Sequence, residues 1–161
     1  GAPRLLTFRV SHYCEKARGA LDAVGAEYVE EPHLPLVHRY FTGRAGARQV
    51  PVLVTPQQTY RDSGEIVRYA DSLAPRYRPL IPHDAGGRSE ALELERYLDR
   101  ELGPHARRWA YCELLDSPLL GPCFAAGVPA VERAIAPLVT AIARPLIRRG
   151  FRITADTARR S

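Results

Sequence analysis

The sequence predicts two parts, an α/β unit followed by an all-helical unit. Short apolar runs alternate with helical spacing over residues 4–73, in the order β-α-β-α-β-β-α. A proline- and glycine-rich stretch without periodicity follows, which is typical of a linker. Every periodic segment beyond it has helical spacing. We therefore expect an α/β domain at 1–75, a linker at 76–87 and a helical domain at 88–161.

The α/β part begins with a predicted βαβ unit. "RLLTFRV" (4–10) is a short apolar run that ends at a turn, and "AEYVEE" (26–31) alternates like a second strand. Between them one apolar helical stripe is formed by Cys14, Ala17, Leu21 and Val24. Gly25 is well placed to end that helix. Two strands joined by one helix predict a parallel pair with a right-handed crossover.

The second half of this part predicts a strand pair and a capped helix. After a weak helical patch near 35–42, "VPVLV" (50–54) predicts a strand and "TYR" (59–61) its short antiparallel partner. "DSGEIVRYADSL" (62–73) predicts a helix, since Asp62 and Glu65 have the spacing of a capping box.

The helical part carries weaker signals. The segment 88–111 predicts a helix that Gly103-Pro104 should break or kink. Residues 117–129 predict a loop or two short turns, and 130–149 an amphipathic helix with kinks at its two prolines. The final "TADTARRS" has the start of another capped helix, so we expect the natural chain to continue.

Charge, apolar run length and cysteine spacing argue against several classes of protein. The net charge is +5, and its basic residues, all but one of them arginine, are spread along the chain rather than gathered with aromatic residues. This distribution does not favour nucleic-acid binding. No run is long enough to span a membrane. Three cysteines at wide, unrelated spacing predict neither disulfides nor a metal site, and they favour a cytoplasmic protein.

The stretch "SHYCEKAR" (11–18) is the first candidate for chemistry. Ser11 is the predicted N-cap of the first helix, where unpaired N–H groups and the helix dipole favour an anion such as a thiolate. Cys14 lies in the first turn but also in the apolar stripe. It is either a buried apolar residue or a thiol activated by the helix N-terminus.

Three motifs together resemble a known family. "SHYCEKARGALDAVGAEY", "QVPVLV" and "YRDSGEIVRYAD", in this order and spacing, are similar to the N-terminal domain of cytosolic glutathione S-transferases. The resemblance implies a thioredoxin-like fold for the first domain and an all-helical second domain. It covers residues 4–73 well. The helical domain is short for the family. We expect it to be truncated, because the sequence stops before the helix that normally forms the core of that domain.

The resemblance also implies roles for particular residues. Ser11 matches the position of the serine or cysteine that faces the glutathione sulfur. Gln49, Val50 and Pro51 match the segment that pairs with the glutathione backbone, and its proline is cis. Asp62 and Ser63 match the pair that holds the γ-glutamyl end, although helix capping alone would also explain both.

We therefore expect a transferase that uses glutathione as co-substrate, needs no metal and acts on a small electrophile. The family commonly forms homodimers. Two alternatives stay open. One is a thiol oxidoreductase in which Cys14 forms a mixed disulfide with glutathione. The other is a non-catalytic binding module that keeps the transferase fold.

Overall fold

The computed structural model describes residues 1–154. It contains a four-stranded sheet with strand order β2-β1-β3-β4. The strands are β1 (Arg4–Thr7), β2 (Val29–Pro32), β3 (Val52–Val54) and β4 (Thr59–Tyr60). β1 pairs with β2 in parallel and with β3 antiparallel, and β3 pairs with β4 antiparallel. The predicted thioredoxin-like order β-α-β-α-β-β-α is confirmed.

Two helices cover one face of this sheet. α1 (His12–Ala23) and α3 (Ser63–Leu73) pack against each other, whereas α2 (His38–Arg44) lies in the connection from β2 to β3. The predicted apolar stripe of α1 faces this core, since Cys14, Ala17 and Leu21 are buried. One core cluster joins helices and sheet through Leu5, Ala17, Leu21, Leu53, Ile66 and Ala70.

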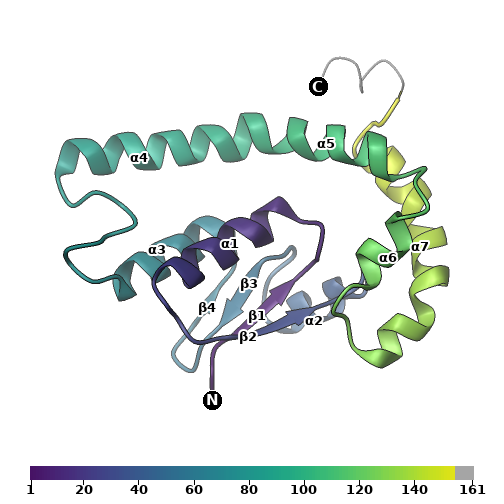
Figure 1. Cartoon of the computed structure of the whole chain (residues 1–161), viewed down its shortest axis with the longest axis horizontal. Coiled ribbons are helices and arrows are strands. Elements are labelled where there is room, and N and C mark those ends of the chain that lie inside the picture. Colours follow the sequence, from purple (N-terminus) through teal and green to yellow (C-terminus); the bar gives the residue numbers. More distant parts are fainter. Residues whose placement is uncertain (155–161) are drawn as a thin grey trace.

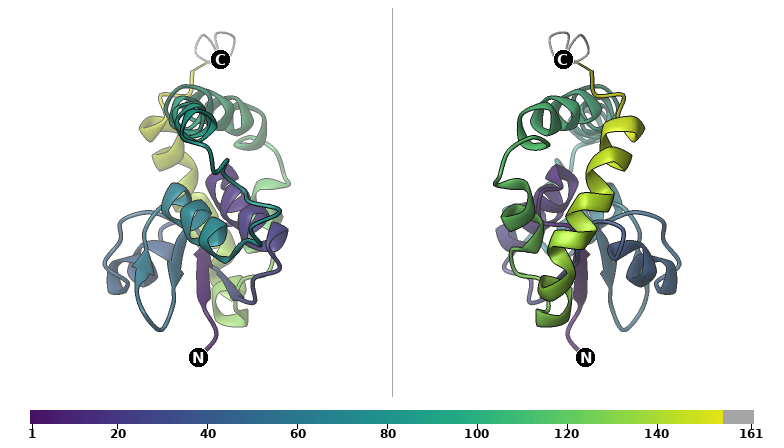
Figure 2. Two further views of the ribbon diagram at one scale, coloured as in Figure 1. Left: turned by 90° about the vertical axis from the view of Figure 1, so that its left-hand side faces the viewer. Right: turned by 90° about the vertical axis from the view of Figure 1, so that its right-hand side faces the viewer.

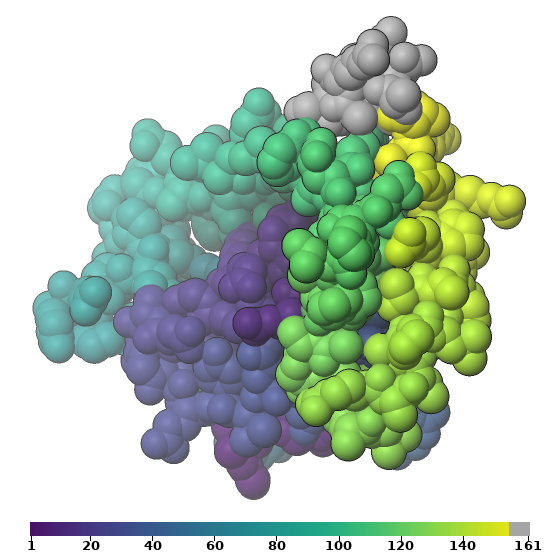
Figure 3. Space-filling view, turned by 45° about the vertical axis from the view of Figure 1, so that its right-hand side comes forward, coloured from purple at the N-terminus to yellow at the C-terminus, as the bar shows by residue number. Residues whose placement is uncertain are grey.

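The helical part consists of a continuous run of helix, which we call the rod (residues 85–114), and two further helices, which we call the wall (residues 120–150). α4 (Ala85–Tyr97), the π-helical turn η1 (Leu98–Leu102) and α5 (Gly103–Leu114) follow one another without a break and run above α1 and α3 (Figures 1 and 2). α6 (Leu120–Ala125) and α7 (Ala130–Gly150) then turn back along the side of the sheet. Figure 3 shows this wall, in green and yellow, against the purple and blue N-terminal part.

A second core cluster joins the two parts. Phe8, directly after β1, and Leu34, in the loop after β2, pack with residues from the end of the rod and from the wall. These are Tyr111, Leu115, Leu120, Phe124, Val128, Ala136, Val139, Ala143 and Ile153. The segments that directly follow β1 and β2 are therefore packed against the helical part.

One buried polar contact adds to that junction. The Glu132 carboxylate, near the start of α7, lies 2.6 Å from His33 Nδ1 and accepts a hydrogen bond of 2.8 Å from the Leu34 backbone N–H. Glu132 is 6% exposed and His33 4%. The His33 ring also stacks on Phe41, with 3.7 Å between the ring centroids. Both carboxylate oxygens thus have a partner in a site with little access to water.

The structure differs from the sequence-based expectations in the helical part. Gly103-Pro104 does not break the rod, because it follows a π-helical turn in which the hydrogen-bond register has already shifted. α4 begins at Ala85, three residues before the expected start, with Asp84 as its cap. The loop expected at 117–129 contains the short helix α6. The helix expected from "TADTARRS" lies almost wholly outside the described residues.

No helix within residues 1–154 is both long and apolar enough to cross a membrane.

Candidate functional site

The turn between β1 and α1 holds Ser11 as an N-cap. Its backbone is extended, with φ −87° and ψ 116°, and its Oγ accepts a hydrogen bond from the Cys14 backbone N–H at 3.4 Å. A hydroxyl that accepts one bond in this way keeps its own O–H hydrogen for another acceptor. Ser11 is partly exposed. It can therefore cap the helix and donate to a group in front of it at the same time.

Cys14 lies in a different environment although it is only three residues away. Its side chain is fully buried, and its Sγ accepts a 3.5 Å hydrogen bond from the Phe8 backbone N–H. Burial raises the pKa of the Cys14 thiol, and the bonds from Phe8 and Ser11 offset this only in part. The thiol is thus mainly protonated near neutral pH. Of the two interpretations of Cys14, the structure favours the buried apolar residue.

The loop before β3 contains a cis peptide bond between Val50 and Pro51, as the family resemblance implied. Pro51 is buried and Val50 partly buried. Gln49, the residue before them, is exposed.

The N-terminus of α3 is capped as the sequence predicts. Asp62 Oδ1 accepts a hydrogen bond of 2.8 Å from the Glu65 backbone N–H, and Glu65 Oε2 accepts one of 2.7 Å from the Arg61 backbone N–H. Ser63 is the first residue of the helix and is buried. An added Cβ on Gly64 would lie 3.3 Å from atoms of Asp62, Arg68 and Glu95, so this first turn approaches other side chains closely.

One cleft of about 800 Å³ lies between the helical rod, the loop before β3 and the start of α3. Five of the predicted site residues line it: Gln49, Val50, Pro51, Asp62 and Ser63. Ser11 lines an adjoining cavity of about 490 Å³. Tyr13, Gln49, Val50 and Arg107 line both, so the two hollows meet at these residues. Cys14 lines neither. We call the larger hollow the polar cleft and the smaller one the second cavity.

The polar cleft carries charges of both signs. Its cationic residues are Arg61, Arg68, Arg96, Arg100 and Arg107, and its acidic residues are Asp62, Glu95 and Asp99. The N-terminus of α3 adds unpaired N–H groups and a partial positive charge. Such a site suits an elongated ligand that has both an ammonium group and carboxylates.

The rod is fastened to α1 at the π-helical turn. The Tyr13 O–H donates a 2.7 Å hydrogen bond to the Asp99 backbone carbonyl, and the Lys16 ammonium lies 2.7 Å from carboxylate oxygens of both Glu95 and Asp99. A Cβ built on Gly103 would lie only 2.4 Å from the Tyr13 hydroxyl oxygen. Glycine at this position therefore allows the close approach of the rod to α1.

Sequence reasoning did not find the residues on the rod side. Tyr13 and Asp99 are separated by 86 residues, and no spacing rule connects them. The contact occurs next to Gly103-Pro104, a dipeptide from which the sequence predicts only a break or kink in the helix. Arg107 stands in an ordinary helical pattern, without any local signal that it faces two hollows.

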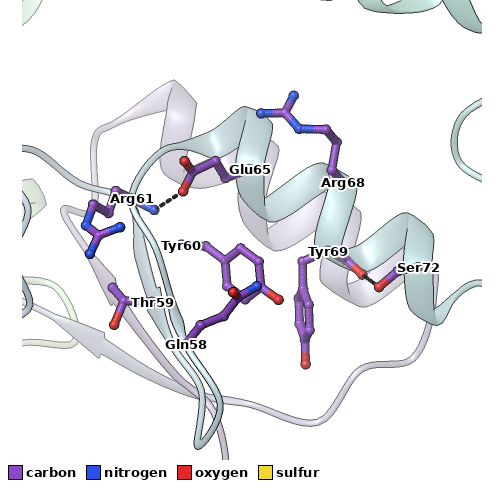
Figure 4. A pocket seen from close by; sticks show the side chains of 8 residues that line it. All are labelled: Gln58, Thr59, Tyr60, Arg61, Glu65, Arg68, Tyr69 and Ser72. Carbon is purple, nitrogen blue, oxygen red and sulfur yellow. Dashed lines mark hydrogen bonds between the residues drawn. The ribbon is translucent and has the colours of Figure 1, made fainter.

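A third pocket, of about 420 Å³, lies over β4 and the outer side of α3 (Figure 4). Tyr60 and Tyr69 face each other there, with 4.6 Å between their ring centroids. None of the predicted site residues lines it. Arg61 and Arg68 line both this pocket and the polar cleft, so the two hollows are neighbours.

The described part of the chain contains no group of three or more His, Cys, Asp or Glu side chains that could hold a metal ion.

Comparison with known proteins identifies the class. Residues 5–100 match the family model of the glutathione S-transferase N-terminal domain. Because this match covers more than half of the chain, the protein belongs to the cytosolic glutathione S-transferase family. No curated protein matches the chain.

Solved structures of glutathione S-transferases have the same fold as this chain. The chain is similar to a Tau class glutathione S-transferase from mango, with 20% identity and a TM-score of 0.58, over 92% of this chain and 61% of that one. It is similar to a theta class enzyme from Xanthomonas axonopodis with glutathione bound, with 17% identity and a TM-score of 0.59, over 92% and 68%. A glutathione transferase homologue from Burkholderia, also with bound glutathione, shares 17% identity and a TM-score of 0.54, over 92% and 98%. The chain thus spans less than two thirds of the mango enzyme.

Proposed function

We propose that this protein is a glutathione transferase that binds glutathione in the polar cleft and transfers its sulfur to a small electrophile. The observation that carries the proposal is that a carboxylate, Asp62, and a hydroxyl, Ser63, line the polar cleft together at the N-terminus of α3. The γ-glutamyl end of glutathione has one ammonium and one carboxylate. Asp62 would bind the ammonium, while Ser63 and the N–H groups of α3 would receive the carboxylate.

The rest of glutathione would follow the loop before β3. Val50 lines the cleft, and its backbone would pair with the peptide as an added strand does. The glycine carboxylate would then lie near Arg96 and Arg100, two arginines of the rod that line the polar cleft but not the second cavity. This orientation brings the cysteine sulfur to the residues shared by the two hollows, close to Ser11.

Ser11 and the first turn of α1 would activate the sulfur. The Ser11 O–H and the helix dipole both favour a thiolate over a thiol, so the glutathione pKa falls. The thiolate then attacks the electrophilic carbon and forms a C–S bond. The leaving group departs with its electron pair, and the thiol proton goes to solvent.

The oxidoreductase alternative is less well supported, because Cys14 is buried and its thiol pKa is raised. A non-catalytic binding module remains the alternative if glutathione does not bind.

The first test is calorimetric titration of glutathione into the protein and into the Ser63→Ala variant. We expect the wild type to bind in the micromolar to millimolar range. Loss of a hydrogen bond to a carboxylate should weaken binding by about 10- to 100-fold, since such bonds contribute about 1.5–3 kcal/mol. Ser72→Ala is the matched control, because Ser72 is an exposed serine at the other end of α3 whose Oγ donates to the Tyr69 carbonyl.

Equal binding by both variants and the wild type would place glutathione elsewhere. No binding by the folded wild type would remove the transferase proposal and favour the binding module.

Detoxification of electrophiles is the role we propose for such an activity. We also propose the cytoplasm as its compartment, where the three free cysteines would stay reduced. The homodimer stays a prediction that sedimentation velocity can test.

A further inference from the structure

The second cavity has an apolar body. Phe8, Val10, Leu36, Tyr111, Leu146 and Phe151 are among its lining residues. They come from the end of β1, the loop after β2, α5 and the end of α7. A hollow of this kind favours a compact aromatic or aliphatic group.

The charges of this cavity differ from those of the polar cleft. Arg39, Arg48 and Arg107 line it, together with His12 and His38. Within residues 1–154 no Asp or Glu lines it, whereas the polar cleft has three acidic residues. The second cavity is thus largely apolar, and the charged side chains that line it are all cationic.

The two histidines contribute little positive charge. Burial lowers the pKa of His12, and the Arg107 guanidinium lowers it further. Burial also lowers the pKa of His38. Both imidazoles are therefore neutral near pH 7, and the positive charge of the cavity comes from its arginines.

Of these three arginines, Arg107 is the best placed to bind a ligand group inside the cavity. Arg39 and Arg48 are exposed, whereas Arg107 is half-buried and lines both hollows. Its guanidinium carbon lies 4.3 Å from the centroid of the Phe151 ring. Its Nε is buried and has no hydrogen-bond partner among the described residues. A buried donor without an acceptor is costly, so this group favours a ligand that supplies one.

We propose that the second cavity selects electrophiles that combine an apolar body with a carboxylate, and that Arg107 is the residue that binds the carboxylate. This inference rests on the proposed transferase function for the reaction itself. The aromatic body would pack against Phe151, and the carboxylate would accept hydrogen bonds from the guanidinium. Arg107 would then be a specificity-determining residue on the electrophile side.

A matched pair of electrophiles tests the inference. 4-(Bromomethyl)benzoate and 4-(bromomethyl)benzamide have similar shapes but differ in charge. In both, the glutathione thiolate forms a C–S bond at the benzylic carbon, and bromide leaves with the bonding pair. The measured quantity is kcat/KM for each, divided by the rate constant of the reaction without enzyme.

We expect the wild type to prefer the benzoate by at least about tenfold. Arg107→Gln should remove this preference, so that the kcat/KM values for the benzoate and the benzamide agree within about twofold. Arg107→Lys should keep part of the preference, and it also serves if the Gln variant does not fold. Arg149→Gln removes the same charge from an exposed position on α7 outside both hollows, so it should keep the full preference.

Direct binding separates this inference from the proposed function. Calorimetry with the unreactive 4-methylbenzoate and 4-methylbenzamide needs no turnover and is done with and without glutathione. Tighter binding of the benzoate that is lost in Arg107→Gln supports the inference even if glutathione does not bind. Equal binding of the two probes, or no binding of either, overturns it. An equal loss of kcat/KM for both electrophiles in Arg107→Gln also overturns it, because Arg107 would then act on the glutathione thiolate.

Discussion

Ser11 and Cys14 are close in sequence, but their side chains are in different environments. Ser11 caps α1 and lines the second cavity, whereas Cys14 points into the core and accepts a bond from the Phe8 N–H. The sequence identified both as candidates and left the role of Cys14 open. Its burial favours a structural role, because a buried thiol that does not line the cavity lacks direct access to a substrate.

Replacement of these two residues should have unequal effects on turnover. Ser11→Ala should lower kcat/KM for glutathione conjugation by about 10- to 100-fold, since a hydrogen bond to a charged group contributes about 1.5–3 kcal/mol. It should also shift the pH–rate profile to higher pH, because the glutathione thiol would lose a donor. Cys14→Ala should change kcat/KM by less than about threefold, because its thiol lines neither hollow. Steady-state kinetics over a range of pH measures both effects.

Ser11→Thr is the control for the first variant, because threonine keeps the hydroxyl and the cap and should restore most of the rate. A larger loss in Cys14→Ala than in Ser11→Ala would contradict the proposed roles and favour the oxidoreductase.

Among elements, the N-terminus of α3 combines a capping role with the glutathione-binding role that we propose for it. Asp62 stabilises the helix by capping and also lines the polar cleft. The capping role follows from the sequence alone. The proposed ligand role depends on the cleft, whose other side is formed by residues of the rod.

Asp62→Asn should separate the two functions. Asparagine is as good an N-cap as aspartate, so the melting temperature should change little. The missing negative charge should weaken glutathione binding by about tenfold or more, since a charge-assisted bond to the ammonium is lost. Asp62→Ala should lose both stability and affinity. Thermal unfolding and calorimetry on the same samples measure the two effects, and unchanged affinity in Asp62→Asn would show that Asp62 only caps the helix.

The sequence predicts the elements of the first part better than those of the second. Alternation, helical spacing and a capping box are local signals, and they give the strands and helices of residues 4–73 in the right order. The rod is different. Leu94, Leu98 and Leu102 follow a helical stripe, yet they are 57%, 40% and 57% exposed in the described structure. Spacing shows that a face is apolar, but it does not show what covers it.

The same limit applies to the site. Its capping and loop residues have local signals, and the family resemblance gives them roles. Tyr13 and Arg107 contribute through contacts between distant segments, which follow from the tertiary arrangement alone.

For the whole molecule, the contact of Glu132 with His33 and Leu34 holds the wall against the sheet. Glu132→Ala should lower the free energy of unfolding by about 3–5 kcal/mol, as loss of one partner of a buried polar pair does. Glu132→Gln should cost less, because its amide oxygen can still accept from the Leu34 N–H. Urea unfolding measures both values.

Glu113→Ala is the control, since Glu113 is an exposed carboxylate on α5. A loss in Glu132→Ala within about 0.5 kcal/mol of this control would show that the buried pair contributes little.

This contact also bears on the order in which the chain is completed at the ribosome. Glu132 is synthesised 99 residues after His33 and 98 after Leu34, when all four strands have already been made. Until then the backbone N–H of Leu34 can be satisfied only by water, because its buried partner does not yet exist. The Leu34 N–H therefore stays hydrated in the nascent protein until the start of α7 has been made, and the Glu132 carboxylate then takes the place of that water.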